Sequence, residues 1–236
     1  MKKFSLISIL AASVLLSGCL MTAPVKEENR IDEVAMYGGI DRSKYPVLKA
    51  ADEKFIADVT AQFGSRERAS ILWVNQGYKF YRQDQLGMAM RRFNQAWLLN
   101  PDNSEVYTGF AAVLSEQDKE CEAMQMMEKA LAMPHYEFQG VYPDAGRIVT
   151  LCSVSDKTLS AEGKAKLWAR SEELYKKGEQ VEPNKQYLYD SWATAYYWQG
   201  KYADAWAMVA KARKLGGQTS KRFLGMLQAK MPQPRT

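Results

Sequence analysis

Hydrophobic and polar positions follow each other at helical spacing along most of the chain, most clearly between Trp73 and Pro101. Small and aromatic residues share the apolar side of this stretch, which predicts two antiparallel helices joined by a short turn. Small side chains let the helices cross closely, and aromatic side chains fill the space between them. Proline stops the second helix because it cannot continue one. The positions are Trp73, Gly77, Phe80, Ala89, Phe93, Ala96 and Pro101.

The same pattern recurs with a period of about 34 residues, which predicts a row of helical hairpins. The second copy keeps the small residues, has non-aromatic apolar residues at some of the aromatic positions, and has its proline one residue early. The fourth copy keeps both kinds of residue. The matching residues are Tyr107, Phe110, Ala111, Leu114, Ala123, Met127, Ala130 and Pro134 in the second copy, and Tyr189, Trp192, Ala193, Tyr196, Ala205 and Val209 in the fourth.

The third copy is irregular. Its second helix, expected over residues 166–183, places Ser171, Tyr175, Gly178 and Pro183 in frame. Its first helix, expected over residues 143–154, lies about ten residues too far upstream for the repeat period. We therefore predict an insertion around residues 155–163.

This pattern resembles the tetratricopeptide repeat (TPR), with Gln76 in place of the family's leucine as the one mismatch in the first unit. The resemblance covers residues 66–230 and implies an all-α fold, a TPR helical-hairpin solenoid with N-terminal and C-terminal capping helices. An all-helical bundle without repeats is the alternative. The expected TPR domain spans residues 50–236. Its repeats are expected at about 70–103, 104–137, 142–185 with the insertion, and 186–219, with capping helices over 48–63 and 219–230.

The first nineteen residues follow a different pattern. Lys2 and Lys3 precede an uncharged, mostly apolar stretch over residues 4–16, which is too short to span a bilayer and is typical of an export signal. The segment Leu16-Ser17-Gly18-Cys19 resembles the bacterial lipobox. That resemblance implies a signal peptide over residues 1–18, cleavage before Cys19, and lipidation of Cys19. An ordinary signal peptide with a chance cysteine is the alternative.

The resemblance to lipoproteins also implies a location. Inner-membrane lipoproteins commonly carry aspartate after the lipidated cysteine, whereas Leu20 stands there in this chain. We therefore expect a lipid anchor in the outer membrane, facing the periplasm. Residues 19–49 are polar and rich in turn-forming residues, so we interpret them as a flexible tether. The segment over residues 34–39 is the part that could dock on the domain.

Composition and charge exclude several classes of function. The 236 residues include 32 basic and 27 acidic ones and a single histidine, His135. This balance does not suit a nucleic-acid partner, which requires a basic face. The chain has no glycine-rich phosphate loop and no Cys/His spacing for a metal. We therefore expect no cofactor, no metal, no small-molecule substrate and no enzymatic activity.

The TPR resemblance implies a binding surface. In that family, fixed positions of the first helix of each repeat line a concave groove. The carboxylate clamp of some TPR domains is not expected, since only Asn75 and Arg82 would suit it. An aromatic-rich groove remains, and tyrosine and tryptophan are well suited to hold a peptide. The alternative is that these aromatic residues pack against other parts of the chain. The expected groove residues are Val74, Tyr78, Tyr81, Arg82, Tyr187, Asp190, Thr194, Tyr197 and Trp198, with Glu105, Thr108, Ala112, Ser115 and Glu116 at the matching positions of the second repeat.

Two cysteines remain after Cys19. In a TPR stack, Cys121 at the start of one helix and Cys152 near the end of another would lie at the same level on neighbouring elements. Because the periplasm is oxidising, we expect a Cys121–Cys152 disulfide. Two buried free thiols are the alternative.

Together these features predict a lipid-anchored TPR scaffold or adaptor for protein–protein interaction in the bacterial envelope. Its expected partner is an envelope protein or peptide held in the groove. The alternative is a structural subunit of an envelope assembly or secretion complex that binds through its convex face and the segment near residues 155–163.

Overall fold

The structure, a computed structural model, describes residues 30–134 and 140–235. In these ranges the chain forms ten α-helices and three short 3-10 helices, without a strand, so the expected all-α class is confirmed for them. The elements are η1 (Ile31–Glu33), η2 (Ala35–Gly39), η3 (Arg42–Lys44), α1 (Pro46–Phe63), α2 (Arg66–Tyr81), α3 (Leu86–Leu99), α4 (Ser104–Glu116), α5 (Glu120–Ala132), α6 (Val141–Ser155), α7 (Ala161–Val181), α8 (Lys185–Trp198), α9 (Tyr202–Lys214) and α10 (Lys221–Lys230).

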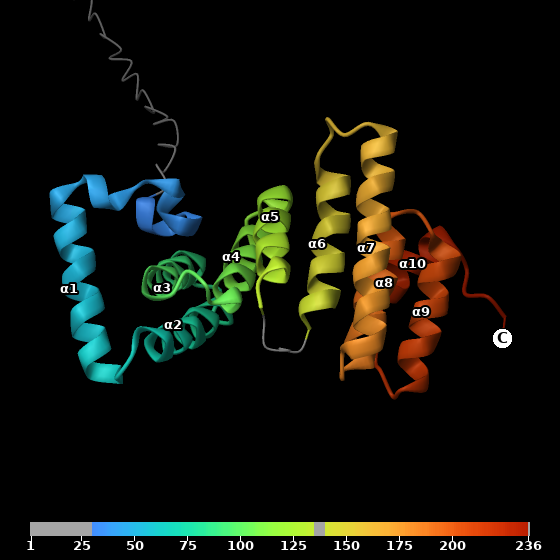
Figure 1. Cartoon of the computed structure of the whole chain (residues 1–236). Helices are drawn as coiled ribbons and strands as arrows, with labels where there is room; N and C mark the ends of the chain where they lie inside the picture. Colours follow the sequence, from blue (N-terminus) through green and yellow to red (C-terminus); the bar gives the residue numbers. More distant parts are fainter. Residues whose placement is uncertain (1–29, 135–139, 236) are drawn as a thin grey trace, which may run out of the picture.

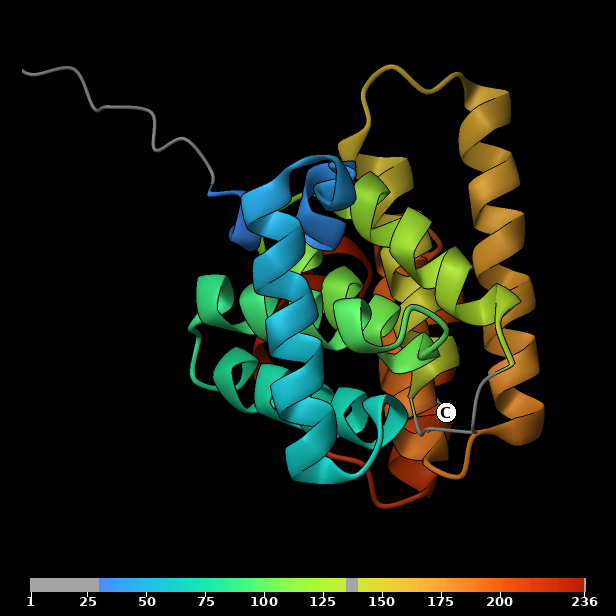
Figure 2. The same cartoon turned by 60° about the vertical axis from the view of Figure 1, so that its left-hand side comes forward.

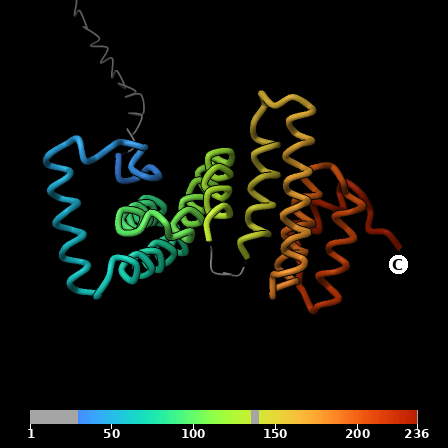
Figure 3. Tube along the Cα trace, viewed as in Figure 1, coloured from blue at the N-terminus to red at the C-terminus, as the bar shows by residue number. Residues whose placement is uncertain are grey.

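The helices pack as consecutive pairs arranged in chain order (Figure 1). The closest packing occurs within the pairs α2/α3, α4/α5, α6/α7 and α8/α9. The tube in Figure 3 shows the first pairs and the last pairs as two groups on either side of α6. Helix α1 packs on α2, and α10 packs on α9, at the two ends of the row.

The turns inside the first, second and last pairs are built in the same way. A residue two or three positions after the end of the first helix has a positive φ, 57° at Asp84, 58° at Asp118 and 75° at Gly200. The following amide reaches back five residues, as from Gln85 N–H to the Phe80 carbonyl at 3.0 Å. This is the usual way to close a helix end with a left-handed residue. The equivalent bonds run from Lys119 to Leu114 and from Lys201 to Tyr196.

The third pair departs from this turn, and not in the way that the sequence predicts. Only residues 156–160 separate α6 from α7, and the Ser160 side chain caps α7 by accepting a hydrogen bond from Gly163 N–H. The extra residues lengthen α7 at its start and form no separate insertion around 155–163. Figure 2 shows the first turns of α7 and the preceding loop projecting beyond the neighbouring helices.

The core is organised around aromatic rings that lie against glycines. Phe93 of α3 is fully buried, and its ring lies between Gly77 of α2 and Gly109 of α4. A β-carbon at Gly77 or Gly109 would come within 2.5 or 2.3 Å of that ring. Tyr175 of α7 has the same relation to Gly146 of α6, where a β-carbon would lie 2.6 Å from the ring. The glycines are therefore required by packing.

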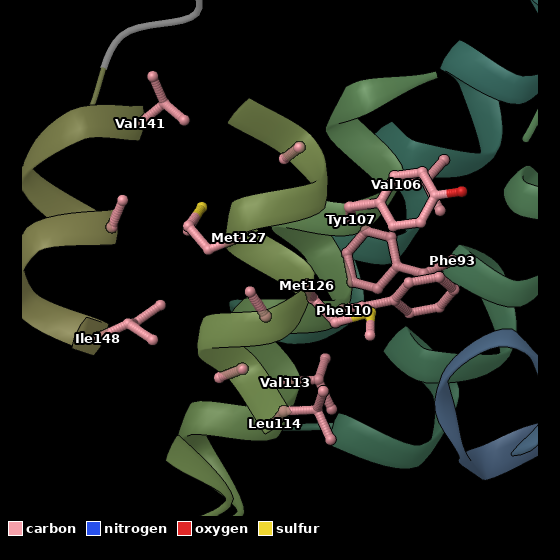
Figure 4. Packing of buried hydrophobic residues seen from close by; sticks show 14 of the residues in the cluster. Phe93, Val106, Tyr107, Phe110, Val113, Leu114, Met126, Met127, Val141 and Ile148 are labelled. Atoms are coloured by element: carbon pink, nitrogen blue, oxygen red, sulfur yellow. The ribbon is translucent and has the colours of Figure 1, made fainter. Parts of the chain in front are cut away.

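The buried residues form two main clusters. The first extends from α2 to α6 and α7, and the second from Tyr175 of α7 to α10. In Figure 4, Met127 of α5 points toward Val141 and Ile148 of α6, where the second and third pairs meet. Because the clusters divide along α7, the molecule has two halves that join through α6 and α7.

η1 and η2 are held against α3, and η3 against α1. This confirms that the segment over residues 34–39 docks on the domain and corrects the expected tether over residues 19–49 for the rest of its described part. Tyr37 is buried, and Asn94 of α3 is fully buried beneath it. Asn94 Oδ1 accepts a hydrogen bond from Tyr37 N–H at 3.1 Å, and its Nδ2 donates to the carbonyls of Asp32 and Val34 at 3.1 and 2.8 Å. Arg91 pairs with Asp32. The polar residues that suggested a tether are thus partners of α3.

Replacing Asn94 by alanine is expected to release this segment. The change leaves a buried N–H and two carbonyls without partners, which costs roughly 2–3 kcal/mol of stability. It also removes the support of Met36 and Tyr37, whose φ angles of 50° and 53° are unusual for these residues. Hydrogen exchange should show loss of protection over residues 30–45, with α4 to α9 unchanged. The exposed Asn75 offers the control, since Asn75→Ala should leave the pattern unaltered.

Candidate functional site

A cavity of about 440 Å³ opens on the side of the molecule formed by the first helices of the pairs. It lies between the second and third pairs, because α6 packs mainly on α5, α7 and α8, while α4 packs on α2, α3 and α5. The first helices of the second and third pairs therefore leave room between them. The lining residues are Tyr78, Tyr81, Glu105, Thr108, Ala112, Met127, Val141, Asp144, Arg147, Ile148 and Tyr187.

The structure brings together some of the expected groove residues. Tyr78 and Tyr81 of α2 and Tyr187 of α8 line the cavity. Val74 does not, which corrects the prediction: it is fully buried in the first core cluster, since α4 packs closely on α2. Arg82 is exposed at the end of α2 and lies outside the cavity lining. Of the positions expected in the second helix pair, Glu105, Thr108 and Ala112 of α4 also line the cavity.

The remaining expected residues, all on α8, do not line this cavity. Asp190 accepts a hydrogen bond from Thr219 Oγ1 at 2.6 Å, and Thr194 donates to the Asp190 carbonyl at 3.0 Å. The Tyr197 ring lies 5.8 Å from the Phe223 ring of α10, so it packs within the chain. Trp198 is 43% exposed and contacts Tyr197. The alternative of internal packing therefore holds for the end of α8.

Sequence analysis missed the contribution of α6. Asp144, Arg147, Ile148 and Val141 all line the cavity, but the irregular third repeat left α6 without a register. Gly146 could have indicated the register of α6. Gly146 contacts an aromatic ring of the following helix as Gly77 does, and Arg147 follows Gly146 as Tyr78 follows Gly77.

Hydrogen bonds between neighbouring pairs fix the tyrosines of the cavity. The Tyr78 hydroxyl lies 2.9 Å from Thr108 Oγ1, and since Thr108 donates to the Glu105 carbonyl, Tyr78 is the donor. Tyr187 donates to Asp144. Outside the cavity, the Glu182 carboxylate caps the start of α6 by accepting from Gly140 N–H at 2.8 Å, which positions Asp144 one turn later. The wall is therefore pre-formed.

The charged groups of the cavity are poorly compensated. Burial raises the pKa of Asp144, although the Tyr187 hydroxyl and Arg147 oppose this rise. Burial alone raises the pKa of Glu105, whose carboxylate makes no hydrogen bond or ion pair with the described residues. Arg147 makes no ion pair within them either. Burial and the Glu116 carboxylate raise the pKa of Tyr81 to about 12, so this hydroxyl stays protonated.

Replacing Glu105 by glutamine is expected to stabilise the unliganded protein slightly at neutral pH. The folded-state pKa of Glu105 is raised, so protonation of this carboxyl group favours the folded state. This contribution to stability is complete below the unfolded-state pKa of about 4.3 and is lost as the pH rises through the folded-state pKa. The charged carboxylate lies in the first turn of α4, where the helix dipole favours it, and this offsets part of the benefit of removing the charge. The melting temperature of the variant should therefore rise by about 1 °C at pH 7. Thermal unfolding should give the variant a higher melting temperature than the parent at pH 7 and the same melting temperature near pH 4. A variant less stable than the parent at pH 7 would contradict this account.

The two cysteines of the domain meet beside the cavity wall. A disulfide joins Cys121 at the start of α5 to Cys152 near the end of α6, the pairing expected from the sequence, with Cα atoms 4.7 Å apart. It links the two helices through which the second and third pairs touch. Cys19, the expected lipidation site, and His135 lie outside the described residues.

Within residues 30–134 and 140–235, acidic, histidine and cysteine side chains do not gather in groups of three that could hold a metal. The helices of the same ranges are too short or too polar to cross a membrane.

Comparison of the chain with protein-family models, with curated proteins and with solved structures finds no match.

Proposed function

We propose that this protein is a TPR solenoid that binds a segment of a partner protein in the cavity between α2, α4, α6 and α8. Two observations support the repeat. The turns after α2, α4 and α8 share one hydrogen-bond pattern. The aromatic residues Phe93 and Tyr175, at matching places of two repeats, each lie against a glycine of the preceding helix. In this proposal α1 and α10 are the caps.

The shape and chemistry of the cavity support a peptide ligand. Its volume of about 440 Å³ suits a few side chains of an extended segment and lies within the usual range of ligand pockets. The three tyrosines are already held by hydrogen bonds, so their rings offer contact area at a small entropic cost. Their hydroxyls act as structural donors to Thr108, Glu116 and Asp144 rather than as a nucleophile with its base. We therefore propose a binding role and no catalysis.

The partner segment can be sought by site-specific photo-crosslinking in envelope extracts. A photoreactive phenylalanine at Tyr187, which is 41% exposed in the cavity wall, should capture the partner. The same group at Ala169, an exposed position of α7, should not. Capture only from Ala169 would contradict the groove proposal and favour the alternative, a structural subunit that binds through the outer face and the first turns of α7.

A matched pair of double variants separates binding from folding. Tyr81→Ala with Tyr187→Ala removes two aromatic residues from the cavity. Ile71→Ala with Leu215→Ala removes two large side chains that are 51% and 53% exposed and lie outside the cavity lining. The first variant should lose the captured partner and the second should keep it, with equal circular dichroism spectra. Equal capture by both would oppose the proposal.

The proposed location rests on the lipobox resemblance at Cys19. We propose that the mature protein is anchored in the outer membrane and presents its domain to the periplasm. Metabolic labelling with a radioactive fatty acid should label the protein, and Cys19→Ala should abolish the label. Equal labelling of the variant would rule out Cys19 as the attachment site.

A further inference from the structure

We propose that the cavity accepts a cationic side chain, lysine or arginine, of the partner segment, between the carboxylates of Glu105 and Asp144 and beside the rings of Tyr78 and Tyr187. This inference rests on the proposed peptide-binding function and names the chemistry that the groove selects.

The first argument is an imbalance of charge. The cavity lining holds two carboxylates, Glu105 on α4 and Asp144 on α6, and one guanidinium, Arg147. Tyr78 lines the cavity together with both carboxylates, and its hydroxyl lies 2.9 Å from Oγ1 of Thr108, which follows Glu105 by three residues on α4. Neither carboxylate has a cation within salt-bridge distance in the described ranges. A partly buried carboxylate without a cation costs free energy, which a cationic ligand would recover.

Elsewhere in the described ranges, buried and partly buried acids have polar partners. Glu182 accepts hydrogen bonds from two backbone N–H groups and Glu120 accepts one from Ser115, while others are paired with arginine. Asp52 bonds to Arg42, Glu128 accepts two hydrogen bonds of 2.9 Å from Arg170, and Glu33 bonds to Arg91. Glu105 is buried to a similar degree and has no such partner. Its isolation is thus particular to the cavity.

Arg147 does not supply the missing charge at Glu105. Arg147 forms no ion pair with Glu105 among the described residues, and its charge lowers the pKa of Asp144, whereas burial alone raises the pKa of Glu105. Glu105 lies on α4, and Arg147 lies on α6 together with Asp144. The Glu105 carboxylate is therefore the group of the lining whose charge the chain leaves uncompensated.

The chain itself contains a closed version of the proposed site. The Arg42 guanidinium lies over the Tyr37 ring, 4.1 Å from its centroid, and donates two hydrogen bonds to Asp52 at 2.7 and 2.5 Å. A carboxylate and a tyrosine face thus hold an arginine within this fold, a combination in which cation–π attraction adds to the ion pair. The cavity offers the same groups from neighbouring helices, with space in place of the arginine.

The test uses the full-length chain in detergent and a displayed library of random peptides. Peptides selected by the parent protein should share a lysine or arginine. A synthetic peptide from this selection should bind about tenfold or more weakly to Glu105→Gln combined with Asp144→Asn. It should bind more tightly to Arg147→Gln, because that change removes a like charge. Glu173→Gln, which removes an exposed charge on α7, should bind as the parent does.

Three other outcomes would overturn the inference in distinguishable ways. Selected peptides rich in aspartate or glutamate, with weaker binding to Arg147→Gln, would assign the cavity to an anion. Peptides without charge preference that still depend on Tyr81 and Tyr187 would preserve the groove function and refute the cation site. If no peptide is selected, while the protein remains folded, the proposed groove function fails together with the inference.

Discussion

Replacing Phe93 by alanine should lower the free energy of unfolding by about 3–5 kcal/mol, the largest effect that we expect of a single substitution. The ring is fully buried and lies against Gly77 and Gly109, and it makes edge contacts with Tyr78 and Phe110 at centroid distances of 5.1 and 6.3 Å. Its removal leaves a cavity that three helices border. Neither glycine can fill this space.

Urea denaturation followed by circular dichroism measures this loss. Ile71→Ala, at a 51% exposed position of α2, is the control and should change stability by less than about 0.5 kcal/mol. Gly109→Ala approaches the same contact from the other side and should cost about 1–3 kcal/mol, because the ring has to move. A loss below about 1 kcal/mol for Phe93→Ala would mean that the three helices do not meet on this ring.

Removing the disulfide should have the second largest effect. Cys121→Ser combined with Cys152→Ser opens a loop closed across 31 positions, which on the chain-entropy model costs about 3–4 kcal/mol. The double variant avoids a lone reactive thiol. Denaturation of the parent protein with and without a reductant provides the control, since the reduced parent should match the variant. Equal stability of all three would show that this link contributes nothing.

The same change should weaken ligand binding. The disulfide joins α5 to α6, through which the second and third pairs touch, and the cavity lies between α4 and α6. Without the disulfide, α6 with Asp144 and Arg147 is held less firmly against α4. Ordering this wall when a ligand binds then has a larger entropic cost. Peptide affinity measured under conditions where both proteins are folded should be lower for the double variant. Unchanged affinity would mean that packing alone holds the wall.

The third repeat marks the limit of prediction from spacing. The positions of Ser171, Tyr175 and Gly178 follow the repeat, and these residues are buried as their role requires. The first helix of the same unit was expected over residues 143–154, close to α6, but its register in the repeat could not be assigned, because the extra residues could equally form a loop or lengthen a helix. They lengthen α7, and as a result the cavity residues of α6 were missed.

The groove prediction failed in part for a related reason. Family positions specify which side of a helix faces inward, but they do not say what covers that side. Tyr197 faces α10, while Val74 lies beneath neighbouring helices and Tyr187 remains open to the cavity. Residues 30–45 show the same limit, since their polarity is compatible with a free tether as well as with hydrogen bonds to Asn94.

The sequence by itself determined the helices and their pairing, because these depend on local periodicity and on residues at fixed spacing. The cysteine pair was expected from the TPR resemblance, and the packing of α5 on α6 brings the two residues together. The tertiary structure decided where the cavity opens, which tyrosines line it, and which carboxylates lack a cation. Those features depend on how α6 packs between α5 and α8, and on contacts between residues far apart in the chain. The isolation of Glu105 is such a feature: it arises because no cation of the folded chain reaches that side of the cavity within the described residues.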